Sequence, residues 1–377
     1  MKNNRWPKHL YALDISRGLA ALAVVLWHWQ HFSYKGNALS ESFDIENQPL
    51  YNILRLFYEK GHMGVEYFFL LSGFIFFWLY SESIQKKTTS AWKFGVHRFS
   101  RLYPLHFVTL LIVALLQTFF ISREGISFVY PFNDLYHFFL NLGFASKWGL
   151  DKGWSFNGPV WSVSIEVLLY LLFFLAAFCR QRGWLFCLSV SIVSFGLLQI
   201  LHHAIFKGLA LFFLGGFVFH LTFLLSTKNQ VKIPIYFIAL LAWTVVIINY
   251  YIFSFTNIIL EFGIGGKILI IGFSNYILFP ITVCSLTIAE IDRGPFLKPM
   301  SWIGDITYSS YLLHFPLQLL FGLAVSLGII NSNFHMNSLY LAIYFIILIP
   351  LSYIIFLKFE VPMQRILRNQ LLPSKKV

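Results

Sequence analysis

Three side chains that can carry charge interrupt an apolar stretch near the start of the chain. Asp14, Arg17 and His28 all lie within LYALDISRGLAALAVVLWHWQHF. At about 100° per residue, a helix would bring all three onto one stripe, with Arg17 and His28 about 16 Å apart along the axis. A guanidinium can hold an anion and an imidazole can accept a proton near neutral pH, so this stripe could bind a charged substrate and act on it. The alternative is a structural Asp14–Arg17 ion pair near one membrane surface and an interfacial histidine at the other.

A pair of arginines occurs in the segment RFSRLYP. Arg98 and Arg101 are three residues apart, so on a helix both can face the same side. Each guanidinium offers paired donors that suit a phosphate, and the two together could hold a phosphate-bearing ligand. The alternative is that both arginines only anchor the cytoplasmic end of a membrane span.

A carboxylate lies in the segment FNGPVWSVSIEVLLY. Asn157 and Pro159 suit the start of a helix, which would place Glu166 about 10 Å inside a span. At that depth Glu166 could reach His28, orient its imidazole and raise its basicity, as a general base requires. Ser162 lies one helical turn before Glu166 and on the same face. The alternative is that Glu166 is only a hydrogen-bonding group between helices.

Two further ionisable residues lie in apolar segments. Glu66, in GHMGVEYFFLLSGFIFF, could line the same outer cavity as Glu166, while Ser72 and Gly73 favour close helix packing. His314 precedes a kinking proline in GDITYSSYLLHFPLQLL. A hydrogen-bonded structural histidine is the alternative to a catalytic one at this position.

Membrane-spanning helices must position these residues. The chain has 377 residues, of which 58% are hydrophobic and only 12% are charged, whereas a soluble domain is about a quarter charged. Apolar stretches about 20 residues long, enough to cross a bilayer, recur from end to end. The sequence therefore predicts an all-α, polytopic integral membrane protein.

About ten transmembrane helices are expected. Their predicted ranges are 10–30, 61–80, 102–121, 158–178, 184–201, 205–225, 233–252, 267–289, 306–329 and 338–357. If the chain starts inside, 20 of its 28 Lys and Arg residues fall on the cytoplasmic side, which agrees with the positive-inside rule. We therefore expect both termini in the cytoplasm and a multi-pass protein of the cytoplasmic (inner) cell membrane.

The chain is expected to form a single membrane domain over residues 1–377. Its spans would cover about 10–362, and a short basic cytoplasmic tail would follow over 363–377. Asp14 and Arg17 interrupt the first apolar segment and no cleavage site follows it, which favours a permanent span over a signal peptide.

Charge and cysteine content exclude several classes of partner. The net charge of +12 is mostly membrane-orienting, which argues against a nucleic-acid partner. Cys179, Cys187 and Cys284 show no CxxC or Cys/His spacing, so neither a disulfide framework nor a metal site is expected.

Five elements of the sequence resemble, in this order, the acyltransferase 3 family of integral-membrane acyltransferases. They are LDISRGLAALAVVLWH, GVEYFFLLSGF, RFSRLYP, WSVSIE and YSSYLLHFP, and they extend from residue 10 to about 362. The resemblance implies transfer of an acyl group, usually acetyl, from cytoplasmic acyl-CoA to a glycan or lipid-linked sugar at the outer face. No permanently bound cofactor is implied, because acyl-CoA is a substrate.

The resemblance also implies roles for individual residues. His28 resembles the family's essential histidine, and Arg17 its N-terminal arginine. Arg98 and Arg101 resemble the paired arginines near the acyl-CoA entrance, and Glu166 the acid of a Trp-x-x-x-x-Glu segment that starts at Trp161.

The sequence departs from the family pattern at two positions. Glu66 stands where many members have Asp, and Val167 follows Glu166 where a second acid or polar residue is common. Neither change removes the expected chemistry. The soluble esterase-like domain of some members is not in this sequence, so the membrane domain is expected to act alone or with a separate partner such as a polysaccharide-assembly protein.

We expect His28 to act as general base while a sugar hydroxyl attacks the thioester. The developing oxyanion needs a donor, for which Trp161, Ser162 and Tyr311 are the candidates. No serine or cysteine lies in a nucleophile elbow such as GxSxG, which favours direct transfer, with an acyl-histidine intermediate as the alternative.

Two other functions are compatible with the same residues. A transporter or flippase for an anionic or lipid-linked sugar would also need charges within the membrane. It predicts that loss of His28 alters glycan export and leaves acylation normal. A structural membrane subunit predicts that changes at Arg17 or His28 affect stability alone.

Overall fold

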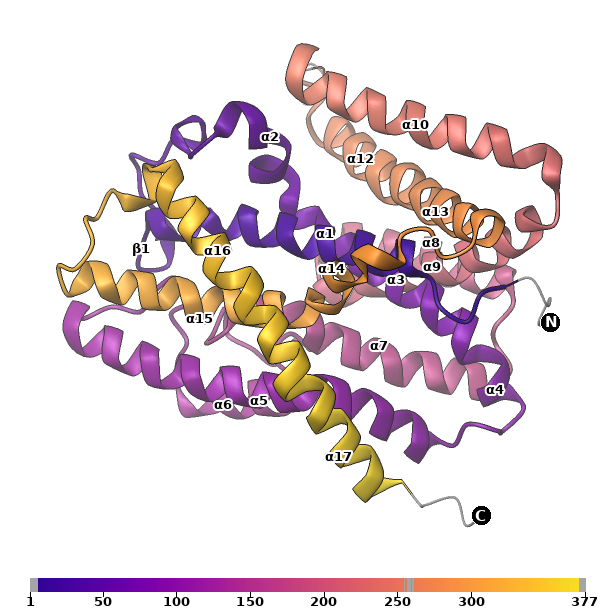
Figure 1. Cartoon of the computed structure of the whole chain (residues 1–377), viewed down its shortest axis with the longest axis horizontal. Coiled ribbons are helices and arrows are strands. Elements are labelled where there is room, and N and C mark those ends of the chain that lie inside the picture. Colours follow the sequence, from indigo (N-terminus) through magenta and orange to yellow (C-terminus); the bar gives the residue numbers. More distant parts are fainter. Residues whose placement is uncertain (1–5, 254, 256–258, 260, 373–377) are drawn as a thin grey trace. The chain divides into compact units, whose positions relative to one another are not determined.

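The structure, a computed structural model, describes residues 6–372 except 254, 256–258 and 260. Residues 1–5 and the last part of the expected tail, 373–377, lie outside the described residues. Within them nearly all regular structure is helical, and the strands are the two-residue β1 (Tyr34–Lys35) and β2 (Ala38–Leu39), which form one antiparallel pair (Figure 1). This confirms the predicted all-α class.

Nine helices in the described part of the chain are long and apolar enough to cross a membrane. Each overlaps one of the ten expected ranges, which confirms a polytopic membrane fold. The remaining expected span, 10–30, corresponds to α1 (Tyr11–Trp27). This helix has only 17 residues and continues as a 3-10 helix over His28–Ser33.

The chain divides into two compact units. The first comprises residues 1–20, 54–86 and 172–304, and the second comprises 21–53, 87–171 and 305–377. Helices α1 and α7 (Trp161–Phe178) each contribute to both units.

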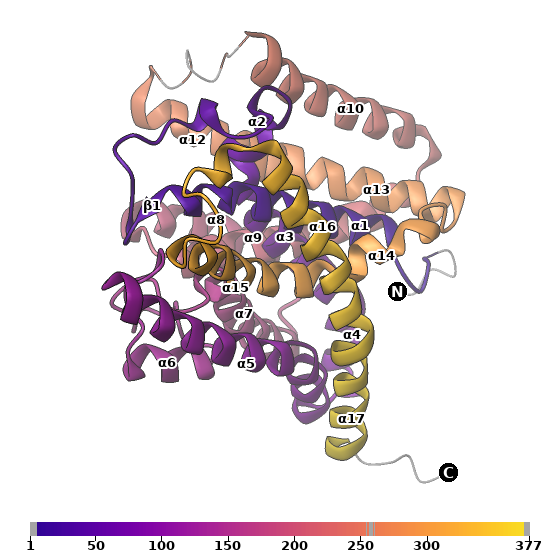
Figure 2. The same cartoon turned by 60° about the vertical axis from the view of Figure 1, so that its left-hand side comes forward.

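The first unit consists of closely packed helices. Besides its parts of α1 and α7, its helices are most of α2 (Tyr51–Lys60), α3 (Gly64–Leu79), α4 (Ser81–Gln85), α8 (Trp184–Leu201), α9 (Ala204–Ser226), α10 (Lys232–Ile248), α12 (Gly263–Phe273), α13 (Phe279–Arg293) and most of α14 (Ser301–Asp305). Helices α10, α12 and α13 lie side by side in both views (Figures 1 and 2).

Glycines set the distance between α3 and α9. A Cβ added at Gly73 would lie 1.8 Å from the Phe212 carbonyl oxygen, and one added at Gly215 would lie 2.0 Å from that of Leu70. Only glycine allows the two backbones to approach so closely. The close packing predicted for Gly73 is therefore confirmed.

The second unit contains fewer but longer helices. Besides its parts of α1 and α7, its helices are α5 (Ala91–Glu124), α6 (Leu135–Leu142), α15 (Thr307–Ser326), α16 (Ser338–Ile355) and α17 (Val361–Leu371), with a π-helical turn over Phe356–Glu360. Helices α5 and α15 run side by side in the same direction (Figures 1 and 2). The Tyr308 hydroxyl donates to the Leu102 carbonyl at 2.6 Å near one end, and Gly322 faces Phe120 near the other.

Two helices extend beyond the expected spans because they pack on each other. Helix α5 begins at Ala91, where Ser90 accepts a capping bond from the Lys93 amide, rather than near residue 102. The last helix continues to Leu371, so residues 363–371 of the expected tail are helical. Arg368 donates from Nε to Ser100 Oγ at 3.0 Å.

Candidate active site

Two histidines of the second unit stand one above the other just after α1. His28 opens the 3-10 helix that follows Trp27, so it is not on α1 itself as expected. A 3-10 helix has about three residues per turn, which places His31 directly over His28. Their ring centroids lie 4.6 Å apart, and both side chains are buried.

Helix α15 supplies the partners of both rings. His314 and Gln318 are one helical turn apart on the same face, and both are fully buried. His314 Nε2 lies 3.1 Å from His28 Nδ1, with the two rings nearly parallel. Gln318 Oε1 lies 2.9 Å from His31 Nδ1, and Gln318 Nε2 donates to the His28 carbonyl at 2.9 Å.

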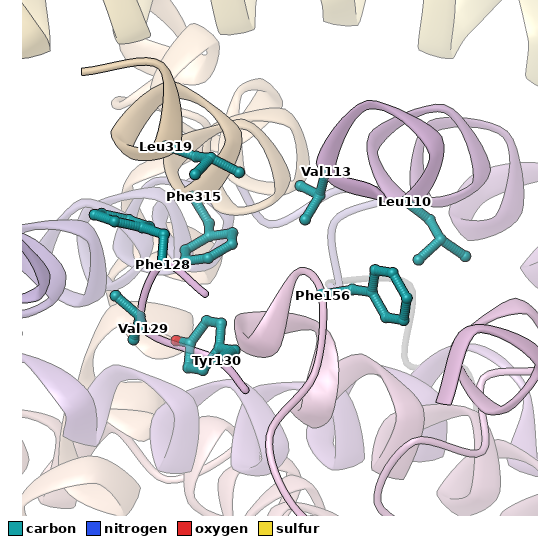
Figure 3. Close-up of a cluster of buried hydrophobic side chains, with 8 residues drawn as sticks. All are labelled: Leu110, Val113, Phe128, Val129, Tyr130, Phe156, Phe315 and Leu319. Carbon is teal, nitrogen blue, oxygen red and sulfur yellow. The ribbon is translucent and has the colours of Figure 1, made fainter. Parts of the chain in front are cut away.

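The segment between α5 and α6 closes one side of this cluster. The Tyr130 hydroxyl lies 3.3 Å from His31 Nε2. Tyr130 also packs against Phe315 in a buried hydrophobic cluster that includes Phe128 (Figure 3). The His31 ring is thus buried between Gln318 and Tyr130.

A serine–tyrosine pair joins α7 to α15 one turn before His314. Ser162 Oγ and the Tyr311 hydroxyl are 2.8 Å apart, and the Tyr311 hydroxyl donates to the Pro159 carbonyl at 2.8 Å. Two of the predicted oxyanion donors thus lie together. The third, Trp161, is half-buried, and its ring centroid lies 6.1 Å from that of Trp154.

Pro316 explains the position of Asn157. Proline has no amide hydrogen, so within α15 the Leu312 carbonyl loses its usual helical donor. Asn157 Nδ2 donates to that carbonyl at 3.0 Å. Asn157 occupies the N-cap position of the 3-10 helix that precedes α7 and Pro159 lies in its first turn, as predicted, but the Asn157 side chain makes no capping bond. Its amide instead connects α15 to the start of α7.

A second polar group lies toward the start of α5 and α15. The Tyr170 hydroxyl donates to Glu166 Oε1 at 2.5 Å, and the Arg98 guanidinium carbon lies 5.9 Å from the centre of the Tyr170 ring. Tyr308 lies close enough to Glu360, Glu166 and Arg101 to interact with their charges. The part of the second unit near the start of α5 and α15 therefore contains arginines, acids and tyrosines.

The two groups lie at different levels along α15. Tyr308 precedes His314 by six residues, about 9 Å at 1.5 Å per residue. Glu166 therefore lies nearer the level of the arginines, whereas His28 lies at the level of His314. The partner that the structure places at His28 Nδ1 is a histidine, and orientation of His28 by Glu166 stays a prediction.

The remaining candidates belong to the first unit. Arg17 pairs with Asp14 at 2.9 Å, and His9 also contacts the Asp14 carboxylate, at 2.6 Å. Glu66 pairs with Lys207 at 2.9 Å. The ion pair foreseen as the structural alternative for Asp14 and Arg17 is thus present, and the predicted catalytic or binding roles of these three residues stay predictions.

Four buried residues of the site were not among the predicted site residues: His31, Tyr130, Tyr170 and Gln318. The three-residue spacing of His28 and His31, and the four-residue spacing of His314 and Gln318, could have indicated two of them. Tyr130 lies in an irregular segment that carries no periodic signal. No group of three His, Cys, Asp or Glu side chains that could hold a metal ion occurs among residues with described positions.

The fold and the site define a multi-pass helical membrane protein with a buried histidine cluster. The model of the acyltransferase 3 family, described as "Acyltransferase domain", matches residues 10–357. The chain therefore belongs to the acyltransferase 3 family.

The chain is also similar in sequence to individual named acyltransferases. Peptidoglycan O-acetyltransferase OatA of Listeria monocytogenes is 23% identical over 82% of this chain and 49% of its own length. O-acetyltransferase OatA of Staphylococcus aureus is 22% identical over 82% of this chain and 51% of its own length. Acyltransferase MdmB of Streptomyces mycarofaciens is 31% identical over 30% of this chain and 27% of its own length. The chain thus spans about half the length of the two OatA proteins, and no solved structure matches it.

Proposed function

We propose that this chain is a membrane O-acyltransferase that moves an acyl group, most simply acetyl, from acyl-CoA to a hydroxyl of a cell-surface or lipid-linked polysaccharide. Membership of the acyltransferase 3 family supports the reaction class. The names of both OatA relatives support acetyl as the group, and the name of the Listeria relative, a peptidoglycan O-acetyltransferase, supports a polysaccharide as the acceptor. Acyl-CoA is the donor substrate, and no permanently bound cofactor takes part.

The observation that carries the proposal is the contact between His28 and His314. An imidazole held in place by a second ring is suited to accept a proton from a hydroxyl near neutral pH. The acceptor oxygen attacks the thioester carbonyl as its proton passes to His28. The C–S bond then breaks, and the CoA thiolate leaves as the thiol after taking the proton.

The arginines supply a site for the donor. Arg98 and Arg101 would hold the phosphates of CoA by paired hydrogen bonds. Arg98 lies four residues before Leu102, which contacts Tyr308, and His314 lies six residues beyond Tyr308. The level of Arg98 is thus about 15 Å from that of His314 at 1.5 Å per residue. An extended pantetheine arm can bridge this distance and present the thioester to His28.

The tetrahedral oxyanion needs a donor in the same region. Tyr311 lies one helical turn before His314 on α15, its hydroxyl contacts that of Ser162 on α7, and Trp161 adjoins Ser162. Direct transfer through one tetrahedral intermediate accounts for these groups without a serine or cysteine nucleophile.

The cellular setting belongs to the same proposal. The protein would lie in the cytoplasmic membrane as a single acyltransferase domain, with both termini in the cytoplasm. It would receive acyl-CoA from the cytoplasm and release the acylated glycan at the outer face, beside proteins of polysaccharide assembly. A transporter or flippase would instead move the glycan without changing it.

Mass spectrometry of surface polysaccharide tests the proposal. Cells that express the wild-type chain should carry acyl esters, and cells that express His28→Ala at the same level should lack them while still exporting the glycan. His202→Asn is the matched control, because His202 is an exposed histidine at the end of α8. Unchanged ester content in His28→Ala would overturn the catalytic assignment of His28, and loss of the glycan itself would favour the transporter.

A further inference from the structure

We propose that His314 is a positioning residue that fixes His28 in the tautomer whose lone pair lies on Nε2, so that two neutral imidazoles do the work usually given to a histidine and a carboxylate. This inference rests on the proposed function, because it specifies how the general base is prepared. It follows from the direction of each hydrogen bond in the cluster.

The first bond fixes the proton of His314. His314 Nδ1 lies 2.6 Å from the carbonyl oxygen of Tyr311. A carbonyl oxygen can only accept a hydrogen bond, so His314 Nδ1 must carry a hydrogen.

The second bond transfers this constraint to His28. His314 is fully buried, and an imidazolium there would lose the hydration that stabilises its charge. Neutral His314, protonated at Nδ1, has its lone pair on Nε2. Since His314 Nε2 faces His28 Nδ1 at 3.1 Å, His28 must donate from Nδ1. The lone pair of His28 is therefore on Nε2, the atom that a general base needs.

The neighbouring histidine is fixed for a different purpose. Gln318 donates from Nε2 to the His28 carbonyl, so its oxygen faces His31 and accepts from Nδ1. His31 Nε2 then accepts from the Tyr130 hydroxyl. His31 thus donates a hydrogen bond from Nδ1 and accepts one at Nε2. We therefore assign proton transfer to His28 rather than to His31.

The pair also accounts for the charge formed during the reaction. When His28 accepts the hydroxyl proton at Nε2, its Nδ1–H bond to His314 becomes a charge-assisted hydrogen bond, which is stronger than a neutral one. His314 in turn donates to the Tyr311 carbonyl. The positive charge is thus stabilised by a chain of two hydrogen bonds that leads from His28 through His314 to the Tyr311 carbonyl.

Nitrogen NMR of the full-length protein tests the tautomer directly. Ring nitrogens labelled with ¹⁵N report which atom carries the hydrogen, and His28→Gln identifies the His28 signals by their loss. Wild-type protein should show His28 protonated at Nδ1. His314→Leu, which removes the acceptor, should show a mixture of tautomers. A wild-type His28 protonated at Nε2 would overturn the inference.

Kinetics provide the second readout. His314→Leu should lower kcat at least about 10-fold, approaching the 10²–10⁴-fold contribution of a general base, with the KM for acetyl-CoA unchanged. His314→Gln keeps an acceptor near His28 Nδ1 and should recover part of this loss. Unchanged kcat in His314→Leu would also overturn the inference.

Tyr344→Phe controls for simple loss of packing. The Tyr344 hydroxyl donates to the main-chain carbonyl of His314 at 2.8 Å and does not bear on the ring protons. This variant should lose stability and keep kcat within a few fold. A loss of kcat in Tyr344→Phe equal to that in His314→Leu would show that His314 is merely structural. If His28→Ala retains full activity, the general-base role proposed for His28 fails, while the NMR result for the tautomer still stands by itself.

Discussion

Gln318 donates its side-chain amide to the main-chain carbonyl of His28 at 2.9 Å, while its amide oxygen reaches His31. One side chain of α15 therefore holds both the backbone and a ring of the 3-10 helix. Because the 3-10 helix continues α1, the position of His28 depends on this single amide as well as on the helix before it.

Removal of this amide should disturb both stability and catalysis. Gln318→Leu leaves two buried groups without a partner, and each costs about 1–3 kcal/mol. We expect a lower midpoint of thermal unfolding in detergent and reduced acyl transfer by the fraction that remains folded.

Gln117 offers a matched control for Gln318. Its side-chain amide is about as buried as that of Gln318. It donates a hydrogen bond to the main-chain carbonyl of Phe128 and accepts one from the main-chain N–H of the same residue. Gln117→Leu should lose similar stability and keep the activity of the folded fraction. Equal losses of activity in the two variants would argue against a special role for Gln318.

Acyl-CoA affinity should depend on the arginine pair. Arg98→Ala and Arg101→Ala each remove donors to phosphate, so the KM for acetyl-CoA should rise about 10-fold or more while kcat changes less. Steady-state kinetics in reconstituted vesicles measure both. Arg365→Ala, an exposed cation on α17, should leave the KM unchanged, and a rise equal to that of Arg98→Ala would point to general charge effects.

Glu290 should contribute strongly to stability although it lies far from α1 in sequence. Its buried carboxylate accepts hydrogen bonds from the main-chain amides of Tyr11 and Ala12 at 2.9 and 2.8 Å. These bonds cap the start of α1. Glu290→Ala leaves both amides unsatisfied, and we expect a loss of about 2–4 kcal/mol, because bonds to a charged group exceed the usual 1 kcal/mol.

Thermal unfolding measures the loss at Glu290. Glu82→Ala removes a carboxylate whose pairing with Lys86 is exposed, and it should change stability by less than about 1 kcal/mol. Similar effects of the two variants would refute the capping role.

The contact between α3 and α9 predicts opposite effects for two alanine substitutions. Gly73→Ala would place a Cβ 1.8 Å from the Phe212 carbonyl oxygen, so the helices must separate, at a cost of about 1–3 kcal/mol. Gly196 lies inside α8 with nothing within 4 Å of an added Cβ, and Gly196→Ala should stabilise the helix by up to about 1 kcal/mol. Unfolding midpoints that shift in the same direction would contradict this prediction.

Hydrophobic length was sufficient to predict the helices but not their ends. Stretches of about 20 apolar residues must become helices in a bilayer, because the backbone has no other way to satisfy its hydrogen bonds. The start of α5 and the end of α17 contain polar residues, and they are helical because they pack on each other, as the bond from Arg368 to Ser100 shows. Such a contact between distant segments leaves no periodic pattern in the sequence.

The candidate site was predicted as individual residues rather than as an arrangement. His28 and Glu166 were identified because ionisable groups are rare in apolar helices, and Arg98 because it lies three residues from Arg101. The contact of His28 with His314 joins residues 286 positions apart, and helical spacing describes only neighbours on one helix. Glu166 was expected to orient His28 because a carboxylate is the usual partner of a basic histidine, whereas its described hydrogen bond comes from Tyr170.

The neutral state that we propose for the His28–His314 pair bears on how the protein responds to a membrane potential. A membrane potential acts only on charges, at about 2.3 kcal/mol per elementary charge per 100 mV. Two neutral imidazoles therefore feel no net force between turnovers, whereas a histidine–carboxylate pair would carry a permanent negative charge into the field. An energised membrane should leave the resting rings in place and act only on the brief imidazolium formed during transfer.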